Sequence, residues 1–187
     1  DELMKTLAAG GFKDITRIAS SSPTMWEHIC AQNQSNISQI LGDYIETLKE
    51  EIELETLLEN ILIMNDFKDI VRPQKGVTQH GVDFSAKKDG IIYLFVLKQK
   101  DIDKNNWNAG NNAVRPTLDE IQDVYIQDRI KDPNSKINIV VCTNGIIKQN
   151  VQAVWNGYIN RNSTDNTKYL FWGIDELTSM TEQVLLN

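Results

Sequence analysis

The sequence predicts an α/β domain with a central mixed β-sheet flanked by helices, preceded by a helical N-terminal extension. Three observations support this fold class. Residues 23–48 carry apolar side chains at helical spacing, residues 91–97 form a nearly continuous apolar run, and helical and strand patterns alternate from residue 50 onward. Such a run is typical of a strand buried on both faces, and alternating strands and helices are typical of α/β sheets.

The N-terminal extension is predicted to form one amphipathic helix or two over residues 23–48. Pro23 follows three serines, whose hydroxyl groups can cap a helix, and proline is accepted in a first helical turn. Apolar residues then recur at spacings of three and four: Met25, Trp26, Ile29, Cys30, Ile37, Ile40, Leu41, Tyr44 and Leu48. Two helices cannot bury this stripe alone, so we expect Trp26, Ile29, Ile37 and Leu41 to pack against another helix. That helix belongs either to the same chain or to a second copy in a homodimer.

The charged triplet Lys49-Glu50-Glu51 divides the chain into a helical segment, residues 1–48, and an α/β domain, residues 50–187. The domain opens with a helix that ends near residue 65 and carries the apolar residues Ile52, Leu54, Leu57, Leu58, Ile61 and Leu62. Strands are predicted over residues 67–72, 81–86 and 90–99. Lys88-Asp89-Gly90 has the composition of a hairpin turn between the last two strands.

The second half of the domain alternates between helices and strands. The polar, Asn-rich segment 101–115 is predicted to be a loop. Helices are expected over residues 116–131, 148–159 and 175–186, and strands over residues 137–142 and 169–172. The order from residue 50 is therefore α-β-β-β-α-β-α-β-α. The hairpin makes part of the sheet antiparallel, and the later crossovers make part of it parallel.

Composition and charge narrow the class of protein. An apolar fraction of 41% with 24% charged residues is typical of a folded domain in water, and no apolar run approaches the roughly 20 residues that cross a bilayer. The acidic start lacks the apolar core of a signal peptide, and Cys30 and Cys142 lack metal-ligand spacing. We therefore expect a cytoplasmic protein with no membrane partner. The net charge of −7 argues against a broad basic face for duplex binding, although a local basic groove is compatible with it.

Residues 8–30 read Ala-Ala-Gly-Gly-Phe-Lys-Asp-Ile-Thr-Arg-Ile-Ala-Ser-Ser-Ser-Pro-Thr-Met-Trp-Glu-His-Ile-Cys. This stretch resembles the C-terminal helical domain of prephenate dehydrogenases, which in that family forms the dimer and closes the substrate site. The resemblance implies that Arg17 binds a carboxylate of prephenate and that Trp26 lies near the substrate. A guanidinium group matches a carboxylate through two parallel hydrogen bonds. In the alternative interpretation, Arg17 is a surface or capping charge and Trp26 packs in a helical core.

The sequence lacks the parts that a dehydrogenase needs for its cofactor. No strand is followed by Gly-x-Gly-x-x-Gly, the turn that holds the pyrophosphate of a dinucleotide, and neither His28 nor His80 lies in a matching catalytic motif. Hydride transfer depends on that cofactor. We therefore expect no NAD binding and no dehydrogenase activity from this chain alone. One hypothesis for its function is a dimerisation fragment of a prephenate dehydrogenase, from tyrosine biosynthesis, without the NAD domain.

Residues 50–187 resemble the PD-(D/E)xK restriction-endonuclease-like fold in the order of elements and in five short motifs. These motifs are Leu54-Glu55, Gly81-Val82-Asp83, Val96-Leu97-Lys98, Thr143-Asn144-Gly145 and Trp172-Gly173-Ile174-Asp175. In active members, an Asp on one strand and an acid or amide two residues before a lysine on the next strand hold a divalent metal ion. The resemblance implies that Asp83 is a metal ligand, Lys98 the catalytic lysine, Glu55 a further catalytic acid, and Mg²⁺ the cofactor.

Val96 stands where the family has its acidic or amide ligand. Valine has no lone pair, so a hard cation loses a ligand unless backbone carbonyls, Gln99 or Glu55 replace it. Two hypotheses therefore stay open for residues 50–187. The first is metal-dependent phosphodiester cleavage, and the second is a non-catalytic nucleic-acid- or protein-binding module of the same fold. In the purely structural interpretation, Lys98 is a lysine at a strand end and Asp83 is an acid that faces a turn.

Basic residues beyond Lys98 indicate where a nucleic acid would bind. Lys100, Lys104 and Arg115 could line a groove for the phosphate backbone, with Trp107 as a platform on which a base stacks. The alternative is a solvated loop that carries the same residues.

Overall fold

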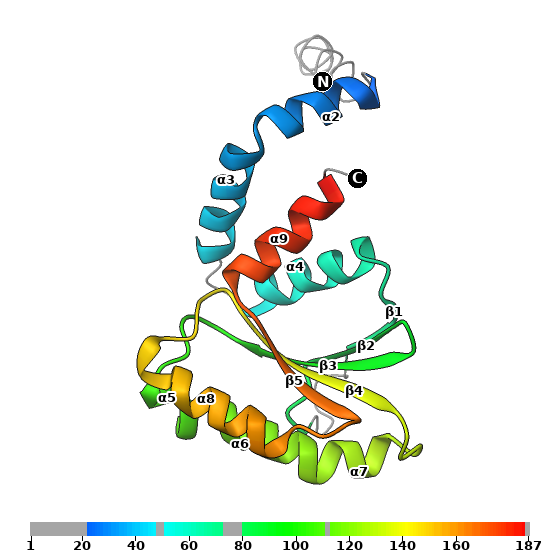
Figure 1. Cartoon of the computed structure of the whole chain (residues 1–187), viewed down its shortest axis with the longest axis vertical. Helices are drawn as coiled ribbons and strands as arrows, with labels where there is room; N and C mark the ends of the chain where they lie inside the picture. The colour runs from blue at the N-terminus through cyan, green and yellow to red at the C-terminus, as the bar shows by residue number, and fades with distance from the viewer. Residues whose placement is uncertain (1–21, 48–50, 73–79, 111–112, 186–187) are drawn as a thin grey trace, which may run out of the picture.

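The computed structural model of the protein describes residues 22–47, 51–72, 80–110 and 113–185. Its centre is a five-stranded sheet with the spatial order β1 (Lys68–Val71), β2 (Phe84–Lys88), β3 (Ile91–Lys98), β4 (Lys136–Thr143) and β5 (Thr167–Trp172) (Figure 1). The pairs β1–β2 and β2–β3 are antiparallel, and the pairs β3–β4 and β4–β5 are parallel. The predicted α/β class with a mixed sheet is therefore confirmed.

The hairpin between β2 and β3 forms at the residues that the sequence indicates. Lys88 pairs with Ile91, and the two residues between them, Asp89 and Gly90, have φ angles of 51° and 76°. Two successive left-handed residues are typical of the tight turns that suit the twist of antiparallel strands. The start of β2 differs from the prediction of residue 81, because His80 and Gly81 are also left-handed, with φ of 47° and 79°, and delay the strand to Phe84.

One face of the sheet is covered by α5 (Lys104–Asn108), α6 (Val114–Glu120), a π-helical turn (Ile121–Tyr125), α7 (Ile126–Arg129) and α8 (Gln149–Asn162) (Figure 1). The apolar core on this face contains Val82, Leu94, Val96, Trp107, Leu118, Ile139, Val141 and Trp155. The opposite face is covered by α4 (Glu51–Met64) and α9 (Ile174–Leu185), over a core with Leu54, Leu58, Phe84, Phe95, Val140 and Leu177. The fold is thus a three-layer arrangement with the sheet in the middle.

The predicted loop over residues 101–115 is partly wrong, because it contains α5 and the start of α6. Asp103 caps α5: its carboxylate accepts hydrogen bonds from the backbone N–H groups of Asn105 and Asn106, and the Asn106 side chain accepts one from the N–H of Asp103. Reciprocal capping of this kind stabilises a short helix without an apolar stripe. Because α5 carries no apolar stripe, apolar periodicity does not predict it.

The N-terminal extension forms two helices, α2 (Pro23–Gln32) and α3 (Gln34–Thr47), as predicted. Helix α3 packs along α9, and Ile45 is 1% exposed in the core beneath α4 and α9. Within one chain, however, the predicted burial of Trp26 and Ile29 is wrong, since these side chains are 36% and 39% exposed. Helix α2 projects beyond the α/β layers (Figure 1).

Ile37 and Leu41 are half-buried on α3. None of the helices in the described part of the chain is long and apolar enough to span a bilayer.

Candidate functional site

The first predicted site residue, Asp83, lies at a bend immediately before β2. Its backbone N–H donates a hydrogen bond of 2.9 Å to the carbonyl of Phe95, and its carboxylate accepts one of 2.7 Å from the N–H of Leu97. Val82 packs in the core under α6 and α8, whereas Phe84 packs in the core under α4, so the alternation of the strand is broken at Asp83. The carboxylate is therefore held against β3, next to the residue that precedes Lys98.

Lys98 ends β3 and extends toward α6. Its Nζ donates a hydrogen bond of 3.3 Å to Oγ1 of Thr117, which in turn donates one of 2.7 Å to the carbonyl of Ala113. Val96 is fully buried on the same face of the strand, in the core that contains Leu118. This arrangement agrees with the expectation that residues two apart along β3 share a face. It also means that the position of the missing metal ligand lies inside an apolar core.

Glu55, the third predicted catalytic residue, has a cationic partner on β1's side of the domain. Its carboxylate lies 3.6 Å from a guanidinium nitrogen of Arg72, which also pairs with Glu59 at 2.5 Å. The same guanidinium lies over the ring of Phe84, 4.8 Å from its centroid. These contacts connect α4 to the segment after β1 and give Glu55 a cationic partner within the fold.

The donor set does not fit a divalent cation. Among the described residues, no group of three or more His, Cys, Asp and Glu side chains is arranged to hold a metal ion. Asp83 already accepts a backbone hydrogen bond, and the buried Val96 side chain offers no oxygen. A hard cation such as Mg²⁺ prefers several oxygen ligands in near-octahedral geometry. The resemblance calls for two metal ligands, one at Asp83 and one at position 96. Among the residues that the structure describes, only the carboxylate of Asp83 is supplied.

Asp83 also contributes to the electrostatics of the core. Burial, followed by the carboxylates of Asp83 and Glu176, raises the pKa of the Cys142 thiol far above its ordinary value. Glu176 is engaged at the start of α9, where it accepts a hydrogen bond of 2.9 Å from the N–H of Gly173. The shift makes Cys142 a protonated, unreactive thiol at neutral pH.

The predicted nucleic-acid-binding residues are placed on separate elements. Lys100 follows β3 and is exposed, Lys104 opens α5 and is exposed, and Arg115 on α6 lies 3.6 Å from the carboxylate of Asp119. Trp107 is 2% exposed and packs edge-on against Trp155 and Tyr158. The suggestion that Trp107 stacks on a base is therefore wrong, because its ring is enclosed in the core.

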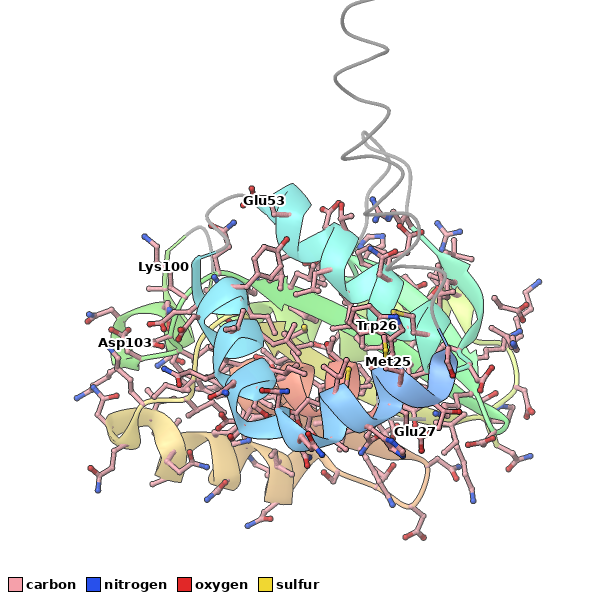
Figure 2. The ribbon with its side chains drawn as sticks, turned by 90° about the horizontal axis from the view of Figure 1, so that it is seen from above. Met25, Trp26, Glu27, Glu53, Lys100 and Asp103 are labelled. Carbon is pink, nitrogen blue, oxygen red and sulfur yellow. The ribbon has the colours of Figure 1, made fainter. Side chains whose placement is uncertain are left out.

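Of the two residues assigned by the first resemblance, only Trp26 is among the described residues, and it is not brought to this region. Arg17 lies outside the described residues. Figure 2 shows Trp26 and Met25 on one side of α2 with Glu27 on the other, whereas Lys100 and Asp103 lie at a different edge of the molecule. Trp26 therefore belongs to an exposed helical surface and does not join Asp83 or Lys98.

A cavity of about 570 Å³, which the sequence does not predict, lies beyond the carboxyl ends of β3 and β4. Its lining includes Lys100 and Asp101 after β3, and Asn144 and Gly145 after β4. The signal was present in the polar, glycine-containing segment that directly follows the apolar strand β4. Such segments at the carboxyl ends of parallel strands commonly form ligand sites.

Comparison with known proteins gives a family match to the N-terminal part of the chain and a similar curated relative. The family model "Prephenate dehydrogenase, dimerization domain" matches residues 1–72. The prephenate dehydrogenase of Bacillus subtilis (strain 168) is 40% identical over 73 residues, which cover 36% of this chain and 20% of the relative. No solved structure matches the chain.

The matched stretch includes α2, α3, α4 and β1, and it continues past residue 49, where the sequence predicts a joint. The chain spans about a fifth of the length of the Bacillus enzyme that it matches. Residues 73–187 lie outside the match to the family model. Over residues 1–72, therefore, the chain is similar to the dimerisation domain of prephenate dehydrogenases.

Proposed function

We propose that residues 1–72 act as a dimerisation segment, through which two copies of this chain associate along α2 and α3. The observation that carries this proposal is the coincidence of two facts. The matched family model describes a dimerisation domain, and the helices within the matched stretch expose large apolar side chains in the single chain: Met25, Trp26, Ile29, Ile40 and Tyr44.

The energetics support self-association. Full burial of a large apolar side chain contributes about 1.5–3 kcal/mol, and the side chains on α2 retain more than a third of their exposed surface. In a two-fold symmetric dimer, each interface residue is buried on both copies, so its contribution counts two times. Helix α3 is anchored on α9, so the exposed face of α2 is presented on a fixed support rather than on a free peptide.

The mass of the protein in solution, measured by light scattering after gel filtration, tests the proposal. The chain should behave as a dimer, and Trp26→Asp should shift it toward the monomer, because a charge on the apolar face of α2 must be desolvated in the dimer. Ala31→Asp is the matched control, since Ala31 is exposed on the opposite face of the same helix. A wild-type chain that stays monomeric at high concentration would refute the proposal.

The same similarity motivates two subordinate proposals about the dehydrogenase chemistry. As the resemblance implies, Arg17 would bind a carboxylate of the substrate, and Trp26 would lie near the substrate. The chain by itself would not bind NAD, because its sequence contains no glycine-rich turn for the pyrophosphate. Titration calorimetry with NAD should therefore show no saturable heat, and micromolar binding would contradict this expectation.

A second candidate function concerns the α/β layers. We propose that they form a restriction-endonuclease-like module that recognises nucleic acid. The support is the order of elements around β1, β2 and β3, together with Asp83 and Lys98 at adjacent strand ends. The single carboxylate and the buried Val96 favour recognition of a nucleic acid over its cleavage. Cleavage that depends on Mg²⁺ would contradict this candidate function.

Degradation of mixed DNA and RNA substrates with Mg²⁺ or Mn²⁺ separates the two outcomes. The expected result is substrate binding without cleavage, with weaker binding and a smaller salt dependence after Lys100→Ala. Cleavage that Asp83→Asn abolishes would instead establish a nuclease. Absence of both binding and cleavage would remove nucleic acid from the function of this chain.

A further inference from the structure

Exposed apolar side chains are concentrated in the stretch that matches the dimerisation domain. In the part of the chain that the structure describes, eight of the eleven exposed large apolar side chains lie within residues 1–72, although this stretch supplies less than half of the described residues. Five of the eight lie on α2 and α3. The other three belong to the end of α4 and to β1: Ile63, Met64 and Val71 are 58%, 47% and 54% exposed. An interface confined to α2 and α3 leaves these three side chains in water.

Ile63, Met64 and Val71 lie at one edge of the α/β layers, which we call the α4 edge. β1 is the outermost strand of the sheet, and Figure 1 shows the end of α4 beside it. Arg72, the residue after β1, pairs with two carboxylates of α4, so β1 runs back along that helix. Leu62, in the same helical turn as Ile63 and Met64, is fully buried in the core. The exposed side chains of the α4 edge are therefore held on a support that is fixed to the sheet.

Charge distinguishes the α4 edge from α2 and α3. Residues 22–47 contain three acidic residues and neither a lysine nor an arginine. Two copies that pair α2 with α2 and α3 with α3 therefore bring only carboxylates together, and like charges facing each other across an interface disfavour it. The α4 edge carries charges of both signs, and its cations are the lysines of β1 and β2: Lys68, Lys87 and Lys88. These lysines can face the carboxylates of α2 and α3, so charge favours a contact between unlike surfaces.

The length of α2 also limits what a symmetric pair of these helices can bury. With ten residues, α2 is about 15 Å long. Two such helices that cross at a two-fold axis form one short contact, whereas specific protein interfaces bury roughly 1,200–2,000 Å². If each α2 packs instead on the α4 edge of the other copy, the symmetry produces the contact twice and covers both sets of apolar side chains.

We propose that the dimer is reciprocal: the α2 face of each copy, formed by Met25, Trp26 and Ile29, docks on the α4 edge of the other copy. This inference rests on the proposed dimerisation and specifies its interface. The apolar side chains of both surfaces lose their contact with water on both copies, which stabilises the dimer. Because α4 covers one face of the sheet, the contact joins each helical extension to the α/β layers of the other copy.

Charge substitutions on the two surfaces test the arrangement through the mass of the full chain in solution, measured by light scattering after gel filtration. Trp26→Asp and Ile63→Lys should each weaken the dimer at least about tenfold, because each places a charge in both apolar contacts. Val154→Lys is the matched control for Ile63→Lys. Val154 is 47% exposed on α8, which covers the opposite face of the sheet, so this variant should keep the wild-type mass. Circular dichroism checks that all three variants are folded.

An equimolar mixture of the Trp26→Asp and Ile63→Lys chains identifies the reciprocal arrangement. In the mixed dimer, one contact joins an unsubstituted α2 face to an unsubstituted α4 edge. The other contact contains both introduced charges, which have opposite signs and attract each other. The mixture should therefore form dimers at concentrations at which each variant alone is monomeric. In a dimer that pairs α2 with α2, mixing restores nothing, because every contact with a Trp26→Asp chain contains the introduced charge.

The outcomes separate this inference from the dimerisation on which it rests. A wild-type chain that is monomeric, or a dimer that survives Trp26→Asp, would refute dimerisation through α2 and this inference with it. A wild-type dimer that Ile63→Lys leaves intact would overturn the reciprocal arrangement alone. Two monomeric variants whose mixture stays monomeric would do the same, and in both cases the proposed dimerisation would stand.

Discussion

At the scale of single residues, the carboxylate of Asp83 is compatible with two roles, a metal ligand and a hydrogen-bond acceptor for the backbone. The motif around it indicates a metal ligand, but the carboxylate accepts a hydrogen bond of 2.7 Å from the N–H of Leu97 and stabilises the irregular start of β2. Backbone bonds of this kind satisfy a buried donor that the broken strand pairing would otherwise leave without a partner. Because Asp83 contributes to the fold, its removal affects stability as well as any activity.

We predict that Asp83→Ala lowers the free energy of unfolding by about 1–3 kcal/mol, the cost of leaving a partly buried N–H without its acceptor. Asp83→Asn retains an acceptor oxygen and should cost less. Urea unfolding followed by circular dichroism measures both. Asp165→Ala, in the exposed loop between α8 and β5, removes the same carboxylate and should change the free energy by no more than about 0.5 kcal/mol. An equally small effect of Asp83→Ala would show that the Leu97 contact contributes little.

Cys142 gives a prediction for alkaline pH. Its pKa in the folded protein is raised from the ordinary value of 9.0, so above that pH the unfolded chain loses a proton that the folded chain keeps. The contribution of this thiol to stability is therefore complete below pH 9 and is lost progressively as the pH rises further, by about 1–2 kcal/mol at pH 10.

The dependence of the free energy of unfolding on pH, measured between pH 8 and pH 10, checks this sign. Cys142→Ala should flatten the decline, whatever its constant effect on stability at lower pH. Val140→Ala is the control, because it alters the same core without removing an ionisable group and should leave the decline as in the wild type. A decline that is unchanged by Cys142→Ala would contradict the assignment.

At the scale of elements, the glycines show where local geometry decides the structure. Gly81 has φ of 79°, and a Cβ atom there would lie 2.7 Å from Cγ2 of Thr117 on α6, so both backbone and packing require glycine. Gly90 in the hairpin turn is left-handed with open space around it, and Gly157 lies within α8, also with open space. The three positions separate backbone strain from steric overlap.

We predict a graded response to alanine. Gly157→Ala should raise the free energy of unfolding by about 0.5–1 kcal/mol, because alanine favours helix interiors. Gly90→Ala should lower it by about 1–2 kcal/mol through left-handed strain alone, and Gly81→Ala should lower it further, because its Cβ also meets α6. Urea titration ranks the three variants. If Gly81→Ala were no worse than Gly90→Ala, the close approach to α6 would be wrong.

The elements also show what a sequence can predict. Apolar runs predict β3 and β4, and apolar residues at helical spacing predict α4 and α9. Burial of one face of a sheet or a helix requires apolar residues at regular spacing in the sequence. The same approach misses α5, whose stability comes from the capping contacts of Asp103, and places the start of β2 too early, because His80 can adopt a left-handed backbone as glycine does. Neither feature leaves a periodic signal.

In the candidate sites as well, the sequence predicts local features but not contacts between distant segments. Residue spacing correctly predicts that Val96 and Lys98 share a face of β3, because alternation along a strand is a local property. It does not predict that Arg72 pairs with Glu55, or that Trp107 is enclosed in the core. These contacts, like the cavity lined by Glu46 and Lys100, depend on which segments the fold brings together.

At the scale of the whole molecule, the helical extension and the α/β layers are connected by packing as well as by the chain. Helix α3 lies along α9, with Gly42 next to Thr178, and Ile45 enters the core shared by α4, α9 and the sheet. The stretch similar to the dimerisation domain also continues through α4, which covers one face of the sheet. The extension is therefore expected to unfold together with the α/β layers rather than as a separate unit.

Ile45 is the residue that tests this cooperativity. It is 1% exposed and belongs to the same core as Leu58, Phe95 and Leu177. Removal of a fully buried isoleucine side chain typically costs about 2–5 kcal/mol, through lost apolar burial and the cavity that remains. If α3 and the α/β layers unfold together, Ile45→Ala should lower the free energy of unfolding of the whole chain by such an amount.

Hydrogen exchange of the amides in α9 and β4, combined with urea unfolding, measures the effect away from the substituted helix. Val154→Ala on the exposed side of α8 removes a similar group and should change stability by no more than about 0.5 kcal/mol. In a cooperative molecule Ile45→Ala accelerates exchange in α3, α9 and β4 together, because all three open through the same global unfolding. Acceleration confined to α3, with β4 as protected as in the wild type, would show instead that the extension opens independently and that only α9 holds it to the sheet.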